Sequence, residues 1–284
     1  MHAARGAPPL SVAVVGAGRA GRARIRALED HPRARLARVV SARGTGPESL
    51  EAALSDSRVE ALILCTPNLL HPAQARAALE AGKHVAVEFP LAPSAREARA
   101  LFDQARASGR VLHVEHIELL SAAQRVQRGR IGALGRPQGG EVAFDAGLEG
   151  WIGDPELAGS EALRALARLH RLVDLFGDAE VAAAELDRGD GYRLCVELRF
   201  REGGSTRLIE ERRPERTRAV FWNVRCQNGV LDDPSAGPPG PVFREDLDVF
   251  VARVRDGAPS YVSEERLLHV LELANAIESL TSGP

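Results

Sequence analysis

The sequence predicts an α/β protein in two parts: an N-terminal doubly wound parallel sheet and a C-terminal α+β part with a mainly antiparallel sheet. Two observations carry this prediction. Over about the first 118 residues, short aliphatic runs alternate with helical segments, as in parallel sheets. From residue 139 onward, longer strands follow one another with turn signals between them. We therefore expect two domains, residues 1–118 and 119–284.

Five short runs rich in aliphatic and β-branched residues predict the parallel strands, because such strands are buried on both faces. The runs are residues 11–15, 36–41, 61–65, 84–88 and 111–114. Helices are expected between them, at residues 19–30, 47–54, 72–80 and 94–109. Ser94 and Glu97 form a capping box at the start of the last helix, and Gly82 and Gly109 mark helix ends.

The second part is predicted to contain a sheet of longer strands. These are residues 139–146, 181–187, 192–200, 206–212 and 218–225. Asp190-Gly191 and Asn228-Gly229 are tight-turn signals, so we expect an antiparallel meander. The remaining elements are a long helix, a loop and two closing helices, at residues 161–176, 232–241, 245–255 and 263–280.

The composition argues against several classes of function. The 284 residues carry a net charge of −2, so no global field attracts nucleic acid or an anionic membrane. The apolar runs are too short to cross a bilayer, and the first residues lack the apolar core of a signal peptide. Cys65, Cys195 and Cys226 lie far apart, which argues against a metal site and a disulfide framework and favours a cytoplasmic location.

A glycine motif follows the first strand directly. Gly16, Gly18 and Gly21 form G-x-G-x-x-G where a buried strand passes into a helix, the context in which this motif binds dinucleotides. Gly16 allows the tight turn, Gly18 lets the backbone approach a pyrophosphate, and Gly21 lets the helix pack closely. With Arg19 and Ala20, this loop predicts a Rossmann cofactor site; the structural alternative is an ordinary strand–helix connection.

The end of the second strand distinguishes NAD from NADP. An acidic residue there would bind the ribose 2′-hydroxyl, but the sequence has Ser41 and Arg43, which suit a 2′-phosphate. We therefore expect NADPH, with NADH as the alternative if Arg43 is a solvated loop residue. Further cofactor contacts are expected where the third and fourth strands end, from Thr66, Pro67, His71, Glu88 and Phe89.

Three segments resemble the Gfo/Idh/MocA oxidoreductases. They are GAGRAG at residues 16–21, TPNLLH at 66–71 and EAGKHVAVEFPLA at 80–92. In that family the last motif usually reads Glu-Lys-Pro, and its lysine takes part in catalysis on sugar-like alcohols. Phe89 stands at the lysine position, and Ala167 and His170 replace the family's His-x-x-Asp motif. The resemblance therefore implies a member without the alcohol-oxidising residues.

Other segments resemble one branch of that family, the animal-type biliverdin reductases. GKHVAVEFP at residues 82–90 is similar to the branch's GKHVLVEYP, and GRVLHVEHIELL at 109–120 is similar to GKVLHEEHVELL. The helix that ends at Leu175-Phe176-Gly177 resembles the branch's RLTWLVSLFG. Phe89 and Val114 replace a tyrosine and a glutamate of the branch, and these departures bear on which bilin is accepted.

The resemblance implies NADPH-dependent reduction of a linear tetrapyrrole, biliverdin to bilirubin, by hydride transfer to the central methine carbon. It implies catalytic roles for Arg168, Glu115 and Glu118. Because bilins are flat and carry two propionates, substrate contacts are expected from aromatic and cationic residues. These are Phe89, His116, Arg164, Arg168 and Arg171. The structural alternatives are a solvated basic helix stripe for the arginines, and bonds to backbone groups or arginines for the glutamates.

Two other functions stay open from the sequence alone. One is a reductase of an imine or a sugar-like substrate, and the other is a catalytically weak NADP-binding regulator. In every case the expected partner is a small molecule, with no nucleic acid and no membrane. The chain is expected to be a monomer or a homo-oligomer.

Overall fold

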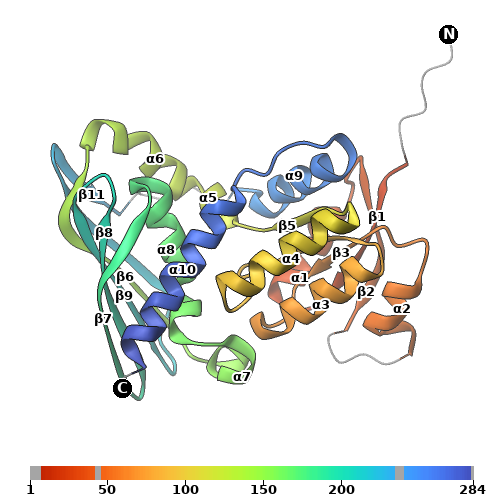
Figure 1. Ribbon diagram of the computed structural model, residues 1–284, viewed down its shortest axis with the longest axis horizontal. Coiled ribbons are helices and arrows are strands. Elements are labelled where there is room, and N and C mark those ends of the chain that lie inside the picture. Colours follow the sequence, from red (N-terminus) through yellow and green to blue (C-terminus); the bar gives the residue numbers. More distant parts are fainter. Residues whose placement is uncertain (1–7, 42–45, 234–239, 283–284) are drawn as a thin grey trace, which may run out of the picture.

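The N-terminal half contains a five-stranded parallel sheet, in the order β2-β1-β3-β4-β5. It lies at the opposite end of the molecule from the C-terminal sheet (Figure 1). The computed structural model describes residues 8–41, 46–233 and 240–282. The strands are β1 (Leu10–Val15), β2 (Ala34–Val40), β3 (Ala61–Leu64), β4 (His84–Val87) and β5 (Leu112–Val114). Every residue of β1, β3 and β5 is buried. The prediction of a doubly wound parallel sheet is confirmed.

Helices cover both faces of this sheet, because alternate strand residues join two separate hydrophobic clusters. One face carries α3 (His71–Glu80) and α4 (Ala95–Ser108). The other carries α1 (Arg19–Leu28) and, from the far end of the chain, α9 (Val242–Asp256). The short elements are η1 (Gly46–Glu48), α2 (Leu50–Ser55) and η2 (Asn68–Leu70). The C-terminal part of the chain therefore helps to build the N-terminal core.

The second sheet has six strands, in the order β11-β10-β6-β9-β8-β7. They are β6 (Pro137–Gly147), β7 (Ala179–Gly189), β8 (Gly191–Phe200), β9 (Ser205–Arg213), β10 (Ala219–Cys226) and β11 (Gly229–Asp232). All neighbours are antiparallel except β6 and β9, which are parallel. The predicted continuous meander is therefore wrong at one place. β6 lies between β9 and β10, because the long connection after β6 carries the chain to the far edge at β7.

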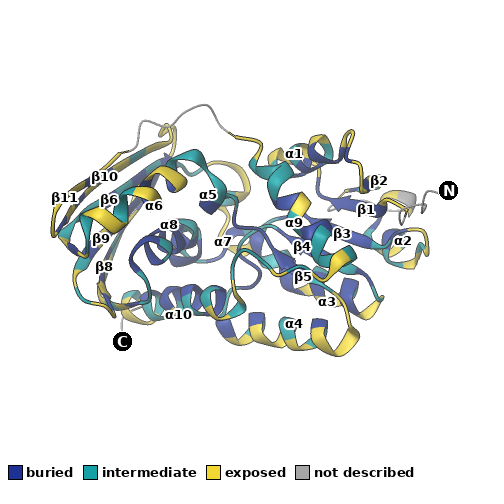
Figure 2. Cartoon of the chain, turned by 90° about the horizontal axis from the view of Figure 1, so that it is seen from above, coloured by how far each residue is buried: buried dark blue, intermediate teal, exposed yellow. Residues whose placement is uncertain are grey.

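Helices α8 (Glu161–Phe176) and α10 (Glu264–Thr281) cover one face of the second sheet (Figure 2). Both begin at a serine, Ser160 and Ser263, whose hydroxyl accepts a hydrogen bond from a backbone N–H of the first turn. The predicted bounds of α8 are confirmed. Since α10 packs against α8, β7 and also α4, it joins the two halves of the molecule.

Several elements were not indicated by the sequence pattern. They are α5 (Ile117–Leu120), α6 (Ala122–Leu134), η3 (Gly150–Gly153), α7 (Pro155–Ala158) and β11. Gly129 and Gly132 weaken the helical pattern of α6, since glycine disfavours a helix interior. Asn228-Gly229 does form the predicted turn, but β11 extends the hairpin to Asp232, where a loop was expected to begin.

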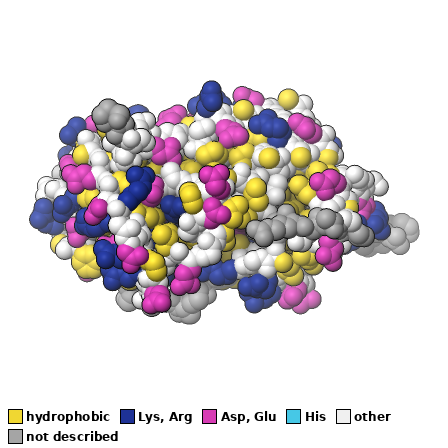
Figure 3. Space-filling model, turned by 90° about the horizontal axis from the view of Figure 1, so that it is seen from below, with side chains coloured by type: hydrophobic (Ala, Val, Ile, Leu, Met, Phe, Trp, Pro, Cys, Tyr) yellow, Lys and Arg dark blue, Asp and Glu magenta, His cyan; other side chains and the backbone are white. Residues whose placement is uncertain are grey.

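Acidic and basic side chains are interspersed on the face that Figure 3 shows, in keeping with the small net charge. Within the described ranges, no helix has both the length and the apolar character that crossing a membrane requires.

Candidate active site

The glycine loop after β1 is shaped by close contacts of its own backbone. Gly16 has a φ of 96°, and a Cβ there would lie 2.5 Å from the Cys65 carbonyl oxygen. A Cβ on Gly21 would lie 1.8 Å from the Gly16 carbonyl oxygen. A Cβ on Gly18, by contrast, would meet no protein atom within 4 Å. The first and third glycines are thus required by the turn, and the second leaves the backbone open to a ligand.

This loop borders a cleft of about 690 Å³ at the carboxyl ends of β1 to β4. Its lining includes most of the predicted cofactor residues: Gly16, Gly18, Arg19, Ala20, Ser41, Thr66, Pro67, His71, Glu88 and Phe89. The N-terminus of α1 has no side-chain cap and no acidic residue in its first turn, so its free N–H groups suit a phosphate. Arg43 lies outside the described residues.

Two aspects of this cleft were missed by sequence reasoning. Trp151 and Ile152, from the unpredicted element η3, line its other wall, and Trp151 is exposed. His71 is buried, and its ring nitrogens lie 2.7 Å from the Pro90 carbonyl oxygen and 2.8 Å from that of Thr66. His71 therefore ties the loop after β3 to the loop after β4.

A second cavity, of about 600 Å³, adjoins the cleft. The two share Arg19, Ala20, Glu88 and Phe89, so they meet where β4 ends. The remaining walls come from α1, α5, α8 and α9 and from the residues just before α5 and β10. They are Ala23, Arg26, Glu115, His116, Ile117, Glu118, Leu119, Ala167, His170, Arg218 and Phe243.

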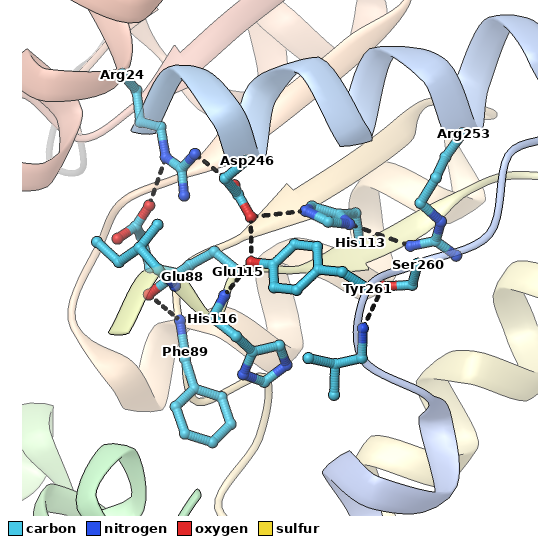
Figure 4. Close-up of polar contacts among 12 residues, drawn as sticks. Arg24, Glu88, Phe89, His113, Glu115, His116, Asp246, Arg253, Ser260 and Tyr261 are labelled. Atoms are coloured by element: carbon cyan, nitrogen blue, oxygen red, sulfur yellow. Dashed lines mark hydrogen bonds and ion pairs between the residues drawn. The ribbon is translucent and has the colours of Figure 1, made fainter. Parts of the chain in front are cut away.

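A buried ionic network lies beneath this junction (Figure 4). Arg24 binds Glu88 at 2.7 Å and Asp246 at 2.6 Å. The other Asp246 oxygen lies 3.0 Å from His113 and accepts from the Tyr261 hydroxyl at 2.6 Å. Burial raises the pKa of Asp246, but Arg24 and then His113 outweigh it and hold the pKa well below its usual range. None of these side chains except Glu88 was proposed from the sequence, because their contacts join segments far apart in the chain.

Glu115 connects this network to the cavity. Its carboxylate accepts from the backbone N–H of Phe89 at 3.3 Å and from that of Ile117 at 2.7 Å. Burial first, and then the neighbouring Glu88, raises the pKa of Glu115 to about 8. The structure therefore shows the bonds to backbone groups that the structural alternative proposed, and burial favours the protonated form of this carboxyl group.

Three rings meet at the cavity wall. His116 and His170 are both buried, and their Nδ1 atoms are 3.0 Å apart. The Phe89 ring lies 4.7 Å from the His116 ring and 5.8 Å from the His170 ring, between centroids. His116 was predicted as a substrate contact; His170 was noted only for its place in the helix motif.

The predicted arginines of α8 lie between α8 and its neighbours rather than in the cavity lining. Arg168 is buried and binds Glu210 at 2.9 Å, and its guanidinium lies 4.0 Å from the centroid of the Phe144 ring. Arg164 lies over Tyr192 at 5.5 Å, and Arg171 over Trp222 at 4.8 Å. The structural alternative of a solvated stripe does not describe Arg168 and Arg171, which are buried.

Arg168 is one of three guanidinium groups around the Phe144 ring. Arg212 and Arg218 lie 5.3 and 5.6 Å from its centroid, and Arg218 also binds Glu118 at 3.0 Å. Arg218 and Glu118 both line the cavity. Burial raises the pKa of Glu210, but Arg168 and then Arg212 outweigh it and keep the pKa low. This wall of the cavity therefore carries an excess of positive charge.

Two family models match the chain. Residues 10–116 match the oxidoreductase family with an NAD-binding Rossmann fold, and residues 140–238 match the biliverdin reductase catalytic region. Biliverdin reductase A of Mus musculus is 34% identical over 95% of each chain. Biliverdin reductase A of Homo sapiens is 32% identical over 94% of each chain.

The fold is similar to that of solved structures. A crystal structure of biliverdin reductase from Synechocystis sp. PCC 6803, in complex with biliverdin and NADP+, superposes with a TM-score of 0.82. The match has 24% identity and covers 97% of this chain and 100% of that one. At this identity the similarity shows the fold, an N-terminal Rossmann sheet with a C-terminal mainly antiparallel sheet.

Proposed function

Because the chain belongs to the biliverdin reductase branch of the Gfo/Idh/MocA oxidoreductases, we propose that it uses NADPH to reduce biliverdin to bilirubin. A hydride goes to the central methine carbon and a proton to a pyrrole nitrogen. The observation that carries the proposal is the meeting of two spaces at Glu88 and Phe89: a cleft with a dinucleotide motif and a second cavity with an aromatic wall.

The cofactor fits the cleft by its chemistry. The open backbone at Gly18 and the uncapped N-terminus of α1 suit the pyrophosphate, and Ser41 lies where the ribose phosphate is expected. When bound, NADPH supplies a hydride. Glu88 and Phe89, at the end of β4, define the boundary at which the nicotinamide meets the substrate.

The cavity suits a flat conjugated substrate with carboxylates. Phe89 offers an apolar face for the tetrapyrrole, and Arg218, backed by Arg168 around Phe144, offers positive charge for a propionate. We propose that Arg168 acts through this charge rather than by direct contact. We propose that Arg164 and Arg171 stabilise the same wall through their contacts with Tyr192 and Trp222.

Glu115 and Glu118 are proposed to position other groups of the cavity. Glu115 holds the backbone of Phe89 and Ile117, so it fixes the position of the aromatic wall. Since it keeps its proton at neutral pH, it adds no negative charge beside a hydride donor. Glu118 orients Arg218 through their ion pair.

The residue at the family's lysine position argues against oxidation of a sugar-like alcohol. Phe89 has no proton to exchange there. Lys83, the single lysine of the chain, donates hydrogen bonds to the carbonyl groups of Asp56 and Val59, before β4 begins. A lysine-dependent reaction therefore has no candidate residue at this site.

Two further predictions belong to this proposal. We propose that residues 1–118 act as the cofactor domain and residues 119–284 as the substrate domain. We also propose a cytoplasmic location, which the three free cysteines favour.

The direct test is to mix the purified protein with NADPH and biliverdin and to follow the absorbance of both bilins. Loss of the biliverdin band with growth of the bilirubin band, faster with NADPH than with NADH, is the expected result. Binding of NADPH without any change in the biliverdin spectrum would reject the proposed reaction.

A further inference from the structure

We propose that His116 and His170 form a two-imidazole relay that delivers the proton taken up by the bilin. This inference rests on the proposed function, since it concerns the same cavity. Its basis is the direct contact of the two rings, with their Nδ1 atoms 3.0 Å apart, their centroids 4.5 Å apart and their planes at 88°.

This contact couples the protonation of one ring to that of the other. A hydrogen bond between two ring nitrogens requires that one carries the hydrogen and the other is bare. Burial, with His170 as the next cause, lowers the pKa of His116, and burial lowers the pKa of His170 to about 4. Both rings are therefore neutral near pH 7. When His170 carries its hydrogen on Nδ1, His116 must carry its own on Nε2.

The pair occupies the wall between two spaces. His116 and His170 both line the cavity beside Phe89. His170 also lines a separate cavity of about 350 Å³, together with Arg128, Asp174, Tyr261 and Arg266. The Nε2 atom of His170 is buried and has no hydrogen-bond partner among the described residues. This ring therefore has one nitrogen bonded to His116 and a second nitrogen that has no partner among the described residues.

The step balances as two proton transfers. The Nε2–H bond of His116 breaks as an N–H bond forms on the bilin, and the Nδ1 proton of His170 moves to Nδ1 of His116. The bare Nε2 of His170 then takes a proton from a water molecule that enters the adjoining cavity when the side chains around it move, and the hydroxide that remains passes to the solvent. The hydride comes from NADPH, so the bilin gains two electrons and two hydrogens in all. When water replaces the product, the same transfers run in reverse and restore the starting tautomers.

Neighbouring groups hold the pair without competing for its ring nitrogens. The Tyr261 hydroxyl accepts from the backbone N–H of His116, and Glu115 is engaged by two backbone N–H groups. The charged and titratable groups around the two rings are Asp174 and Arg266 beside His170, and His113 and Asp246 beside His116. Within the part of the chain that the structure describes, none of these bonds to an imidazole nitrogen of the pair.

His170→Asn is the informative variant. An asparagine amide can keep a hydrogen bond to His116 Nδ1 but cannot pass a proton on. With NADPH prebound, we expect the single-turnover rate of biliverdin reduction to fall by about 10²-fold, the usual contribution of a general acid. NADPH affinity, followed by fluorescence, should stay unchanged. His84→Asn is the matched control, because His84 lies at the other end of β4, and it should keep the full rate.

A solvent isotope measurement distinguishes a relay from a structural role. In mixtures of H2O and D2O, two protons in flight give the wild-type rate a curved dependence on deuterium fraction, and His170→Asn should make it linear. The wild-type curve needs no variant, so it tests the relay even if the substitution disturbs folding. The relay would be overturned if His170→Asn reduced biliverdin as fast as the wild type does. It would also be overturned if the rate of the wild-type protein did not change with the deuterium fraction. Absence of turnover by the wild-type protein would instead reject the proposed function.

Discussion

At the scale of single residues, the charged neighbours of each buried carboxyl group decide whether it is ionised. Glu115, Glu210 and Asp246 are all buried carboxyl groups, yet their pKa values move in different directions. Glu210 and Asp246 each face arginines that outweigh the effect of burial. At Glu115, burial and the neighbouring Glu88 raise the pKa by more than Arg24 and the backbone N–H of Ile117 lower it, so the protonated form is favoured. The sequence predicted Glu115 as important, but not its charge, because charge depends on neighbours that only folding brings together.

Glu115 should make the stability of the protein depend on pH. Its pKa is about 4.5 in a free chain and about 8 in the fold, so the folded state holds the proton more tightly. The stability that this group contributes is fully present below about pH 4.5 and is lost as the pH rises through 8. We expect Glu115→Gln to lose stability less steeply than the wild type over this range in urea unfolding. If the stability of the two proteins changed with pH in the same way, the raised pKa of Glu115 would be contradicted.

Substitution of Arg168 tests whether the arginines around Phe144 affect catalysis or only the stability of the fold. Arg168→Met leaves Glu210 with a single arginine partner, so both stability and turnover should fall. The ion pair between Glu210 and Arg212 remains in this variant, so the protein should still fold, with a lower melting temperature. We expect its kcat/KM, measured well below that melting temperature, to fall about tenfold, equivalent to about 1.4 kcal/mol. Unchanged kcat/KM despite a lower melting temperature would make Arg168 purely structural.

At the scale of elements, the parallel sheet and α8 were predictable because their patterns are local. Their signals are aliphatic runs, a serine cap and terminal glycines. These lie within each segment, so they can be recognised without knowing which distant residues the segment contacts. The place of β6 between β9 and β10 was not predictable in this way, since strand order depends on pairing across the whole sheet. The helix α6 and the short element η3 were missed for a related reason: glycines weaken their local patterns, so packing against the rest of the protein is needed to order them. As a result, Trp151 in η3 was absent from the predicted site.

The glycine loop provides a matched pair of substitutions at this scale. Gly21→Ala would place its Cβ 1.8 Å from the Gly16 carbonyl oxygen, so the turn must distort and the protein should be destabilised. Gly18→Ala meets no protein atom within 4 Å and should fold normally, but it should bind NADPH more weakly. Thermal unfolding and NADPH titration measure the two effects. Unchanged NADPH affinity in Gly18→Ala would argue against a pyrophosphate at this loop.

At the scale of the whole molecule, the site is assembled from both ends of the chain. The N-terminal half provides the glycine loop, Arg24 and Glu88, and the last two helices and the loop between them provide Asp246 and Tyr261. Since α9 packs against α1 and its residue Phe243 lines the second cavity, that cavity is complete only when segments from both ends of the chain are in place. Sequence reasoning could name residues on each wall, but it could not predict the network that joins them.

Asp246 should therefore contribute to the stability of the whole protein. Asp246→Asn leaves buried Arg24 without one of its two carboxylate partners and changes the bonds to His113 and Tyr261. We expect unfolding to become easier by about 3–5 kcal/mol, the range for a broken buried ion pair. Asp248→Asn, on the same helix but half exposed, is the control and should change stability by less than about 1 kcal/mol. If both variants lost a similar amount of stability, the buried network would contribute little to the free energy of unfolding.

The most direct test of the proposed reaction follows the hydrogen that is transferred. Biliverdin is mixed with the protein and with NADPH that carries deuterium at both C4 positions of the nicotinamide, and the product is analysed by mass spectrometry and NMR. The account predicts bilirubin with one deuterium on the central bridging carbon. Bilirubin without deuterium at that carbon, or no bilirubin at all, would contradict hydride transfer at the junction of the two cavities.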